Sequence, residues 1–266
     1  MPTPLVHLYV SQKILESGDG LVVVPLSGNA GDFMLGSIAP DAWTLGELSR
    51  TDAHLLPIPA PQDAYGAAEL LCRYPALRDA GALEPAQAAF VAGYMTHLLL
   101  DEIWYHDLFY PHFLNANNDL PVRQRLVRHN VLRLAVEDDL ESRVTPASIQ
   151  SLSVERVGYA LPPIDDSTLT TWRDLIRDEF SPGGQKRSAH VFAERMRVPV
   201  EELTAILHSP ARMQEEVFGQ LPAGLPARVI DDGICLGTDL LRVYLNGRPE
   251  DMAGAVLKAL RASRHV

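Results

Sequence analysis

Hydrophobic residues recur every three to four positions along most of the chain, which is the spacing of one face of an α-helix. Near the beginning, Val6, Val10 and Ile14 form such a stripe, and the segment Ser-Gly-Asp-Gly follows it as a stop signal. No stretch alternates convincingly between hydrophobic and polar residues, as a half-buried strand would. The sequence therefore predicts an all-α protein of about eight to ten helices.

Glycine and proline residues predict where several helices begin and end. Residues 17–30 are interpreted as a glycine-rich turn around a short apolar segment. A short helix is expected to stop at Pro40, with Asp41 just beyond it. A further helix over residues 63–79 is expected to be interrupted near Pro75.

The second half of the chain continues the helical pattern. Residues 121–145 are expected to be helical, and another helix is expected from residue 167, with Ser167 or Thr168 as its N-cap. The segment Ser-Pro-Gly-Gly from residue 181 should end that helix. Because no internal repeat, low-complexity tract or clear linker divides the sequence, we expect a single helical domain over residues 1–266.

The segment from Phe90 to Phe113 combines helical hydrophobicity with ionisable side chains. It reads FVAGYMTHLLLDEIWYHDLFYPHF, with His97 and Asp101 four residues apart. On a helix that spacing places both side chains on one face, about one turn apart. Buried ionisable groups need partners, and a metal ion is a strong partner for an imidazole and a carboxylate. A solvated helix edge, or a hydrogen-bonded His–Asp pair in the core, is the alternative that this motif alone leaves open.

Composition and charge narrow the classes of function. The 34 acidic and 23 basic residues give a net charge of −11, which argues against a non-specific nucleic-acid binder. The two cysteines, Cys72 and Cys235, form neither a disulfide framework nor a metal-binding motif. The N-terminal residues lack a signal-peptide pattern, and no apolar run approaches the roughly 18 residues of a membrane span. We therefore expect a soluble, cytoplasmic protein without a transmembrane segment.

Several motifs, taken in order, resemble the bacterial zinc-dependent phospholipase C family. They are His7 near the N-terminus, GSIAPD with Asp41, the Arg-x-x-x-His motif that ends at His54, and GYMTHLLLDEIWYH. The resemblance covers about the first hundred residues, and the late stretch ARVIDDGICLGTDLLRVYL is also similar. That family shares its all-helical fold with fungal single-strand nucleases and resembles the catalytic domain of a phospholipase D that cleaves glycosylphosphatidylinositol anchors. The resemblance implies a multi-helix bundle of this type, with a metal site built mainly from residues 1–145.

The resemblance also implies a cluster of up to three zinc ions that hydrolyses a phosphoric ester. The first metal would be held by Asp41, His54, His97 and Asp101, and Asp101 would bridge to a second metal to which His7 contributes. Asp41 and Asp101 are the implied catalytic residues, and Asp41 is also the implied general base. Each ligating imidazole needs an acceptor for its other N–H group. Three acidic residues are candidates for that role: Asp52, Glu102 and Asp107.

The sequence does not decide which residues would form the third metal site. The family's pattern implies a histidine soon after the H-x-x-x-D motif, for which His106 and His112 are the alternatives. It also implies a pair of ligands on the next helix, where His129 and Glu137 are available. The position four residues from each of them is Arg133, so an H-x-x-x-E pair is not present.

The function expected from these motifs is hydrolysis of a phosphodiester by a zinc-bound water. The expected substrate is a phosphate-ester small molecule or a phospholipid head group. One alternative is a single-strand nuclease of the same fold, for which Trp43, Trp104 and Trp172 offer stacking surfaces. The other is a catalytically inactive helical protein that binds or scaffolds partners and keeps only part of the metal cluster.

Overall fold

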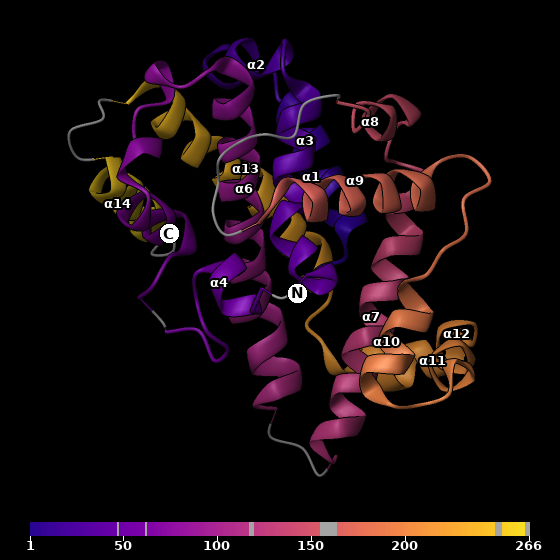
Figure 1. The fold of residues 1–266 in the computed structure, drawn as a ribbon. Coiled ribbons are helices and arrows are strands. Elements are labelled where there is room, and N and C mark those ends of the chain that lie inside the picture. The colour runs from indigo at the N-terminus through magenta and orange to yellow at the C-terminus, as the bar shows by residue number, and fades with distance from the viewer. Residues whose placement is uncertain (47, 62, 117–119, 155–163, 248–251, 264–266) are drawn as a thin grey trace.

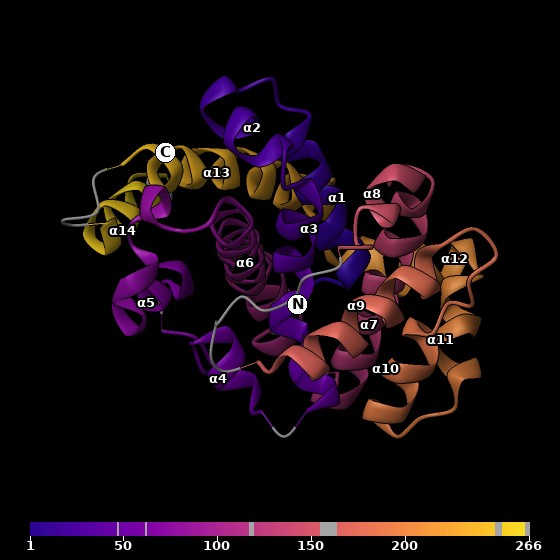
Figure 2. The same ribbon diagram turned by 45° about the horizontal axis from the view of Figure 1, so that its top comes forward.

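The helix Pro85–Ile103 (α6) lies at the centre of the molecule, surrounded by other helices (Figures 1 and 2). Every residue of α6 from Ala88 onward is buried, which explains why its sequence is apolar all round. Helices from the first and last thirds of the chain pack against it, and they include α1 (Pro4–Leu15), α3 (Ala30–Ile38), α5 (Gly66–Arg73) and α13 (Leu225–Asn246).

The computed structural model describes all residues except 47, 62, 117–119, 155–163, 248–251 and 264–266. In the described part, 76% of the residues are helical and no strand is present. The remaining helices, in chain order, are α2 (Gly20–Ser27), η1 (Ala39–Leu45), α4 (Arg50–His54), η2 (Pro75–Leu77), η3 (Ala80–Ala82), η4 (Trp104–Leu114), α7 (Val122–Glu141), α8 (Pro146–Gln150), α9 (Asp166–Phe180), α10 (Ser188–Met196), α11 (Val200–Leu207), α12 (Pro210–Arg212), η5 (Met213–Val217), η6 (Phe218–Gln220) and α14 (Met252–Ser263). The elements η4 and η5 are π-helices, and the other η elements are 3₁₀-helices.

The backbones of α3 and α6 approach each other closely because each helix has a glycine at the crossing. A β-carbon on Gly36 would lie 2.0 Å from the carbonyl oxygen of Phe90, and one on Gly93 would lie 2.0 Å from the carbonyl oxygen of Phe33. Non-bonded atoms cannot come that close, so only glycine permits this packing. The C-terminal end of α3 is therefore held against the middle of α6.

A second group of helices packs around α7. Helix α7 contacts α1, α10, α11, η4 and η5, and the ribbon shows α10, α11 and α12 gathered beside α7 (Figure 1). The neighbouring helix α9 is fastened to the end of α3, because the indole N–H of Trp172 donates a hydrogen bond of 2.8 Å to the carbonyl of Ile38. The 3₁₀-helix η1, which follows α3 directly, contacts both α6 and α9.

The all-α prediction is confirmed, and the structure corrects it in three details. Fourteen α-helices are present in the described part, more than predicted, because several are very short. Residues 17–30 are not a turn: Asp19 caps a helix, α2, by accepting a hydrogen bond from the backbone N–H of Leu21. The N-cap of α9 is Asp165, which accepts a hydrogen bond from the backbone of Thr168.

Within the described residues, no single helix combines the length and the apolar composition needed to cross a membrane. By those two measures, α2 and the helical segment Ala30–Leu45 qualify only as a pair, with a 99° bend between them.

Candidate metal centre

His97 and Asp101 face the same side of α6, as their spacing predicts. His97 is fully buried and Asp101 nearly so, and the Nε2 atom of His97 lies 4.0 Å from Oδ2 of Asp101. A third group, His54 at the end of α4, brings its Nε2 atom to 3.4 Å from the same carboxylate oxygen. Three ionisable side chains from two helices therefore converge in the interior.

Backbone carbonyls fix the tautomers of both histidines. The Nδ1 atom of His97 lies 2.8 Å from the carbonyl oxygen of Ser37, and Nδ1 of His54 lies 3.2 Å from the carbonyl oxygen of Arg50. A carbonyl only accepts, so each Nδ1 carries a hydrogen, and a ring in its neutral form presents the lone pair of Nε2 to the cluster. This is the arrangement that orients histidine ligands in metal sites.

The two Nε2 atoms, of His54 and His97, lie 3.3 Å apart. Two lone pairs that face each other at this distance repel unless a cation stands beside them. Zn–N bonds of about 2.0–2.1 Å in tetrahedral geometry place two ligating nitrogens roughly 3.3–3.4 Å apart. The observed separation is therefore the one expected for two histidines on one zinc ion.

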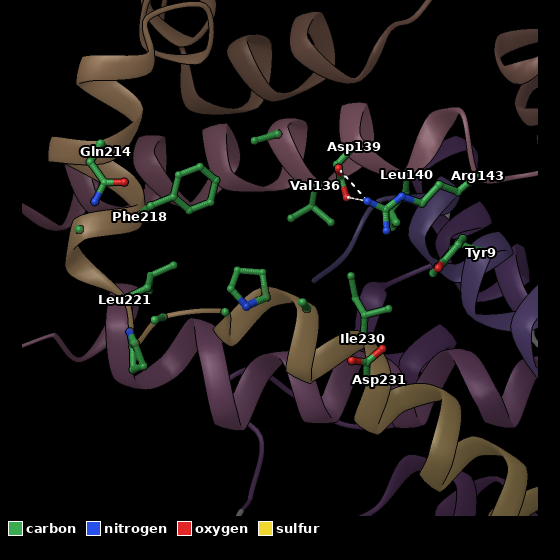
Figure 3. A pocket seen from close by; sticks show the side chains of 17 residues that line it. Tyr9, Val136, Asp139, Leu140, Arg143, Gln214, Phe218, Leu221, Ile230 and Asp231 are labelled. Atoms are coloured by element: carbon green, nitrogen blue, oxygen red, sulfur yellow. Dashed lines mark hydrogen bonds and ion pairs between the residues drawn. The ribbon is translucent and has the colours of Figure 1, made fainter.

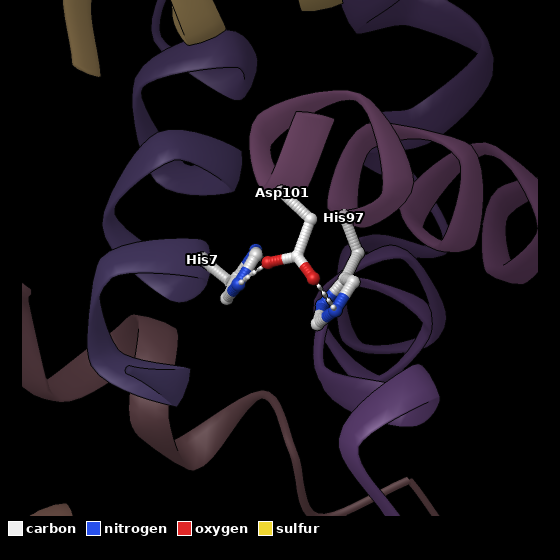
Figure 4. Close-up of side chains that lie close together, drawn as sticks. All are labelled: His7, His97 and Asp101. Atoms are coloured by element: carbon white, nitrogen blue, oxygen red, sulfur yellow. Dashed lines mark ion pairs between the residues drawn. The ribbon is translucent and has the colours of Figure 1, made fainter. Parts of the chain in front are cut away.

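Asp101 presents its two oxygens to two sides of the cluster. Oδ1 lies 3.6 Å from Nε2 of His7, on α1, while Oδ2 faces His97 (Figure 4). Oδ2 also faces His54. The rings of His7 and His97 are stacked, with centroids 3.8 Å apart and planes 10° from parallel. A carboxylate placed between two sets of imidazoles in this way is suited to bridge two cations.

Asp41 closes the cluster on its more exposed side. It lies in η1, its side chain is 21% exposed, and its Oδ1 is 3.5 Å from Nε2 of His54. Burial raises the pKa of Asp41, but its interactions with His54 and His97 outweigh burial and hold that pKa below its ordinary value. Asp41 is thus an ionised carboxylate at the rim of the site.

The other pKa shifts also favour cation binding. Burial and the neighbouring His7 ring lower the pKa of His97 to about 3. Burial raises the pKa of Asp101, but the His7 ring, 3.6 Å away, and the nearby His97 and His54 hold it well below its ordinary value. At neutral pH, His97 is neutral and both carboxylates are charged, which are the states in which these groups bind metal ions.

The donor set fits divalent cations. Two groups have all their ligand atoms within 4.8 Å of one another: His7, His97 and Asp101, and also Asp41, His54 and His97. In the described structure, both ring nitrogens of His7 and Oδ1 of Asp101 are buried without a hydrogen-bond partner. Because such orphaned atoms are costly, a ligand that satisfies them is expected. A small cavity of about 30 Å³, enough for an ion or a water molecule, touches His54 and Asp101.

The predicted third site is not assembled among the described residues, because neither group includes His106, His129 or Glu137. His129 is buried, and its Nε2 accepts a hydrogen bond of 2.9 Å from the indole of Trp104. Glu137 accepts a hydrogen bond from Ser188. His106 is half-buried in the π-helix η4, with its ring edge-on to a neighbouring tyrosine.

The hydrogen-bond partners of the histidines were only partly foreseen. For His54 and His97, backbone carbonyls take the role proposed for Asp52, Glu102 and Asp107. Glu102 instead accepts a hydrogen bond from the backbone of Gly66, and Asp52 accepts one from Ser49 at the start of α4.

An arginine that the motifs did not identify as functional also contacts the cluster. The guanidinium of Arg50 donates a hydrogen bond of 3.0 Å to Oδ2 of Asp101. Arg50 lies four residues before His54, so its place on the same face of a helix was the available signal.

The described structure also contains two larger cavities. One, of about 590 Å³, is enclosed by α7, η6 and α13, with Val136, Leu140 and Ile230 among its lining residues (Figure 3). None of the converging ligands lines it, so it does not belong to the candidate metal centre. The other, of about 540 Å³, is lined by residues of α9 and α10 and reaches Asp41.

Comparison of the chain with protein-family models, with curated proteins and with solved structures found no match.

Proposed function

We propose that this chain is a metal-dependent hydrolase of phosphoric esters, with up to two zinc ions held by His7, Asp41, His54, His97 and Asp101. The observation that carries the proposal is the pair of Nε2 lone pairs, 3.3 Å apart, that face two ionised carboxylates in the interior. The resemblance of the GSIAPD and H-x-x-x-D segments to zinc-dependent phospholipases C supports the same chemistry.

Zinc ions at such a site activate water for attack and stabilise the charge on the phosphate oxygens. Groups of the protein itself hold the metal ligands in position. Ser37 and Arg50 orient the two imidazoles through their carbonyls, and Asp101 separates the two halves of the cluster. Asp41 contacts His54 and also lines the cavity of about 540 Å³, where its carboxylate would accept a hydrogen bond from a water activated by bound zinc.

A metal count is the direct test. Protein purified without chelator should contain between one and about two equivalents of zinc, and it should hydrolyse a generic phosphodiester. The Asp101→Asn variant should lose zinc and lose activity by about 100-fold or more, because one negative ligand is gone. Asp139→Asn, which changes an exposed carboxylate on α7, is the matched control and should keep both.

Substrate assays with and without zinc separate the remaining readings. Hydrolysis of phosphatidylcholine supports phospholipase C-like activity, while cleavage of single-stranded DNA supports the nuclease alternative. Protein with less than one equivalent of any transition metal and no hydrolysis of either substrate contradicts the proposal. Such a result leaves a helical binding or scaffolding protein.

A further inference from the structure

Arg133 is a half-buried cation whose two hydrogen bonds go to neutral groups. It lies on α7, one turn from His129 and one turn from Glu137, where the third metal site was sought. One terminal nitrogen donates a hydrogen bond to the side chain of Asn130, and the other donates one to the carbonyl of Pro2. In the described part of the chain no ion pair joins this guanidinium to a carboxylate, and its Nε has no hydrogen-bond partner.

Three contacts position the guanidinium of Arg133. The guanidinium lies over the ring of Phe192, 3.9 Å from the ring centroid, and the two neutral hydrogen bonds fix its orientation. Burial lowers the pKa of Arg133 to about 10, while the nearby charge of Asp41 acts to raise it. Arg133 is thus still protonated at neutral pH, and the cost of burying its charge is offset only in part by what surrounds it.

Arg133 lines the cavity of about 540 Å³ that also contains Asp41. A second arginine, Arg195, stands on the same wall. The third, Arg187, pairs with Glu179 within the cavity lining and so has its charge balanced. Asp41 and Glu194 also line the cavity, but among the described residues neither carboxylate forms an ion pair with Arg133 or Arg195.

We propose that Arg133, together with Arg195, binds the phosphate of the substrate beside the metal centre. In this chain the guanidinium of Arg133 then occupies the part of the site where a third metal ion was predicted. Its planar fork can donate to two oxygens of one phosphate. The reaction that this contact serves rests on the proposed function, whereas anion binding by Arg133 is measurable without catalysis.

The remaining walls of the cavity indicate the organic part of the ester. They are apolar and aromatic, with contributions from Trp172, Phe180 and Phe192. A cavity of about 540 Å³ falls within the range of small-molecule sites. The substrate class is therefore a small phosphoric ester with an apolar or aromatic group, its phosphate directed toward Arg133 and its organic group against α9 and α10.

Binding of inorganic phosphate tests the role of Arg133. Titration calorimetry on the zinc-loaded chain, and on the same protein after chelation, is run for the wild type, Arg133→Met, Arg133→Lys and Arg228→Met. The first variant should weaken phosphate binding by about tenfold or more, since charge-assisted hydrogen bonds are lost. Lysine keeps the charge without the fork and should restore part of the affinity. The matched control, at Arg228 on α13, should stay within about twofold of the wild type.

Zinc content, measured on the same samples, separates this inference from the proposed function. If all variants bind zinc and Arg133→Met binds phosphate as well as the wild type does, the role of Arg133 is refuted and the metal centre stands. If the wild type lacks zinc, the proposed function fails, and the chelated series still decides whether Arg133 binds the anion. Wild-type protein that binds no phosphate in either form refutes the inference. If Arg133→Met does not fold, Arg133→Lys decides, and unchanged phosphate affinity in it overturns the proposal.

A second variant tests the apolar wall. Phe180→Ala should raise KM for a soluble nitrophenyl phosphodiester several-fold, because an aromatic contact is removed. It should leave the affinity for inorganic phosphate unchanged. An unchanged KM contradicts the placement of the organic group against α9. Hydrolysis of phosphatidylcholine vesicles without any hydrolysis of the soluble ester contradicts the small-molecule class.

Discussion

Asp101 is the residue on which the two halves of the candidate site depend, and its charge has two kinds of partner. One is built into the chain, since Arg50 donates a hydrogen bond to Oδ2 from a side chain that is 24% exposed. The other would be the proposed metal ion, held by the imidazoles. Both partners would neutralise the same buried carboxylate. The stabilisation that Arg50 contributes to the fold should therefore depend on whether the metal is bound.

Replacement of Arg50 by methionine tests this dependence. Without metal, Arg50→Met should lower the free energy of unfolding by about 2 kcal/mol, the scale of one hydrogen bond between charged groups. In the zinc-loaded protein the loss should be smaller, because the metal neutralises Asp101 in its place. Chemical denaturation with and without zinc measures both values. Arg73→Met removes an exposed pair with Glu69 and should cost less than about 0.5 kcal/mol in either form. Equal losses at Arg50 in both forms contradict a metal beside Asp101.

At the scale of elements, the contact between α3 and α6 positions the imidazole of His97. The carbonyl that fixes its tautomer belongs to Ser37, one residue after Gly36, at the crossing where the two backbones touch. The orientation of the His97 ring therefore depends on how closely α3 and α6 pack. A change that separates α3 from α6 also moves the acceptor away from Nδ1.

Gly93→Ala is the variant that separates them. The added β-carbon would fall 2.0 Å from the carbonyl oxygen of Phe33, so the helices must shift, and we expect a loss of about 3 kcal/mol or more in the free energy of unfolding. Zinc affinity, measured by competition with a chelator, should fall as well because Ser37 is displaced. Gly28→Ala has no neighbour within 4 Å and should change stability by no more than about 0.5 kcal/mol. A stable Gly93→Ala protein with unchanged zinc affinity would show that this crossing does not position His97.

The long elements could be predicted from the sequence, and the short ones could not. α6 and α7 have the length and the apolar content that make a helix recognisable without tertiary context. α2 was missed because its apolar residues show no helical periodicity and glycines flank it. The start of α9 was misplaced by two or three residues because Asp165 competes with nearby Ser167 and Thr168 as a cap, and all three have suitable oxygens.

The same limit applies to the candidate site. The spacing of His97 and Asp101 on one helix is a local property, and the structure brings them together as predicted. The role of His129 depends instead on Trp104, whose indole reaches its Nε2 from the preceding helical segment. The cationic surroundings supplied by Arg50 and Arg133 are tertiary contacts as well, so residue spacing alone did not reveal them.

At the scale of the whole molecule, burial of neutral histidines links folding to pH. Burial lowers the pKa of His97 to about 3 and holds the pKa of His129 well below its ordinary value. These rings lie on α6 and α7 and are both inside the fold. In the unfolded chain each titrates near the ordinary value of about 6.5. Below that pH the unfolded chain therefore binds more protons than the folded chain does, and stability must fall as the pH falls.

We expect the metal-free protein to lose stability between pH 7 and pH 4, with each of these histidines contributing up to about 1.4 kcal/mol per pH unit once the pH is below 6.5. His129 gives the cleaner test because it lies outside both metal groups. Replacing it by glutamine removes the titrating ring, so the slope of unfolding free energy against pH should become shallower by up to that amount, even though the variant is less stable at pH 7. Denaturation curves at several pH values, in the presence of a chelator, measure the slope.

Comparison with an exposed histidine shows whether burial is the cause. His190, on α10, lies at the surface, so His190→Gln should leave the slope as it is in the wild type. Retention of the full wild-type slope in His129→Gln would mean that the buried ring takes up no extra proton on unfolding. The hydrogen bond from Trp104 makes that outcome unexpected, since an Nε2 atom that accepts from an indole N–H cannot also carry a proton. Protonation of His129 therefore requires that α7 first move away from η4, and acid unfolding of the metal-free chain supplies that movement.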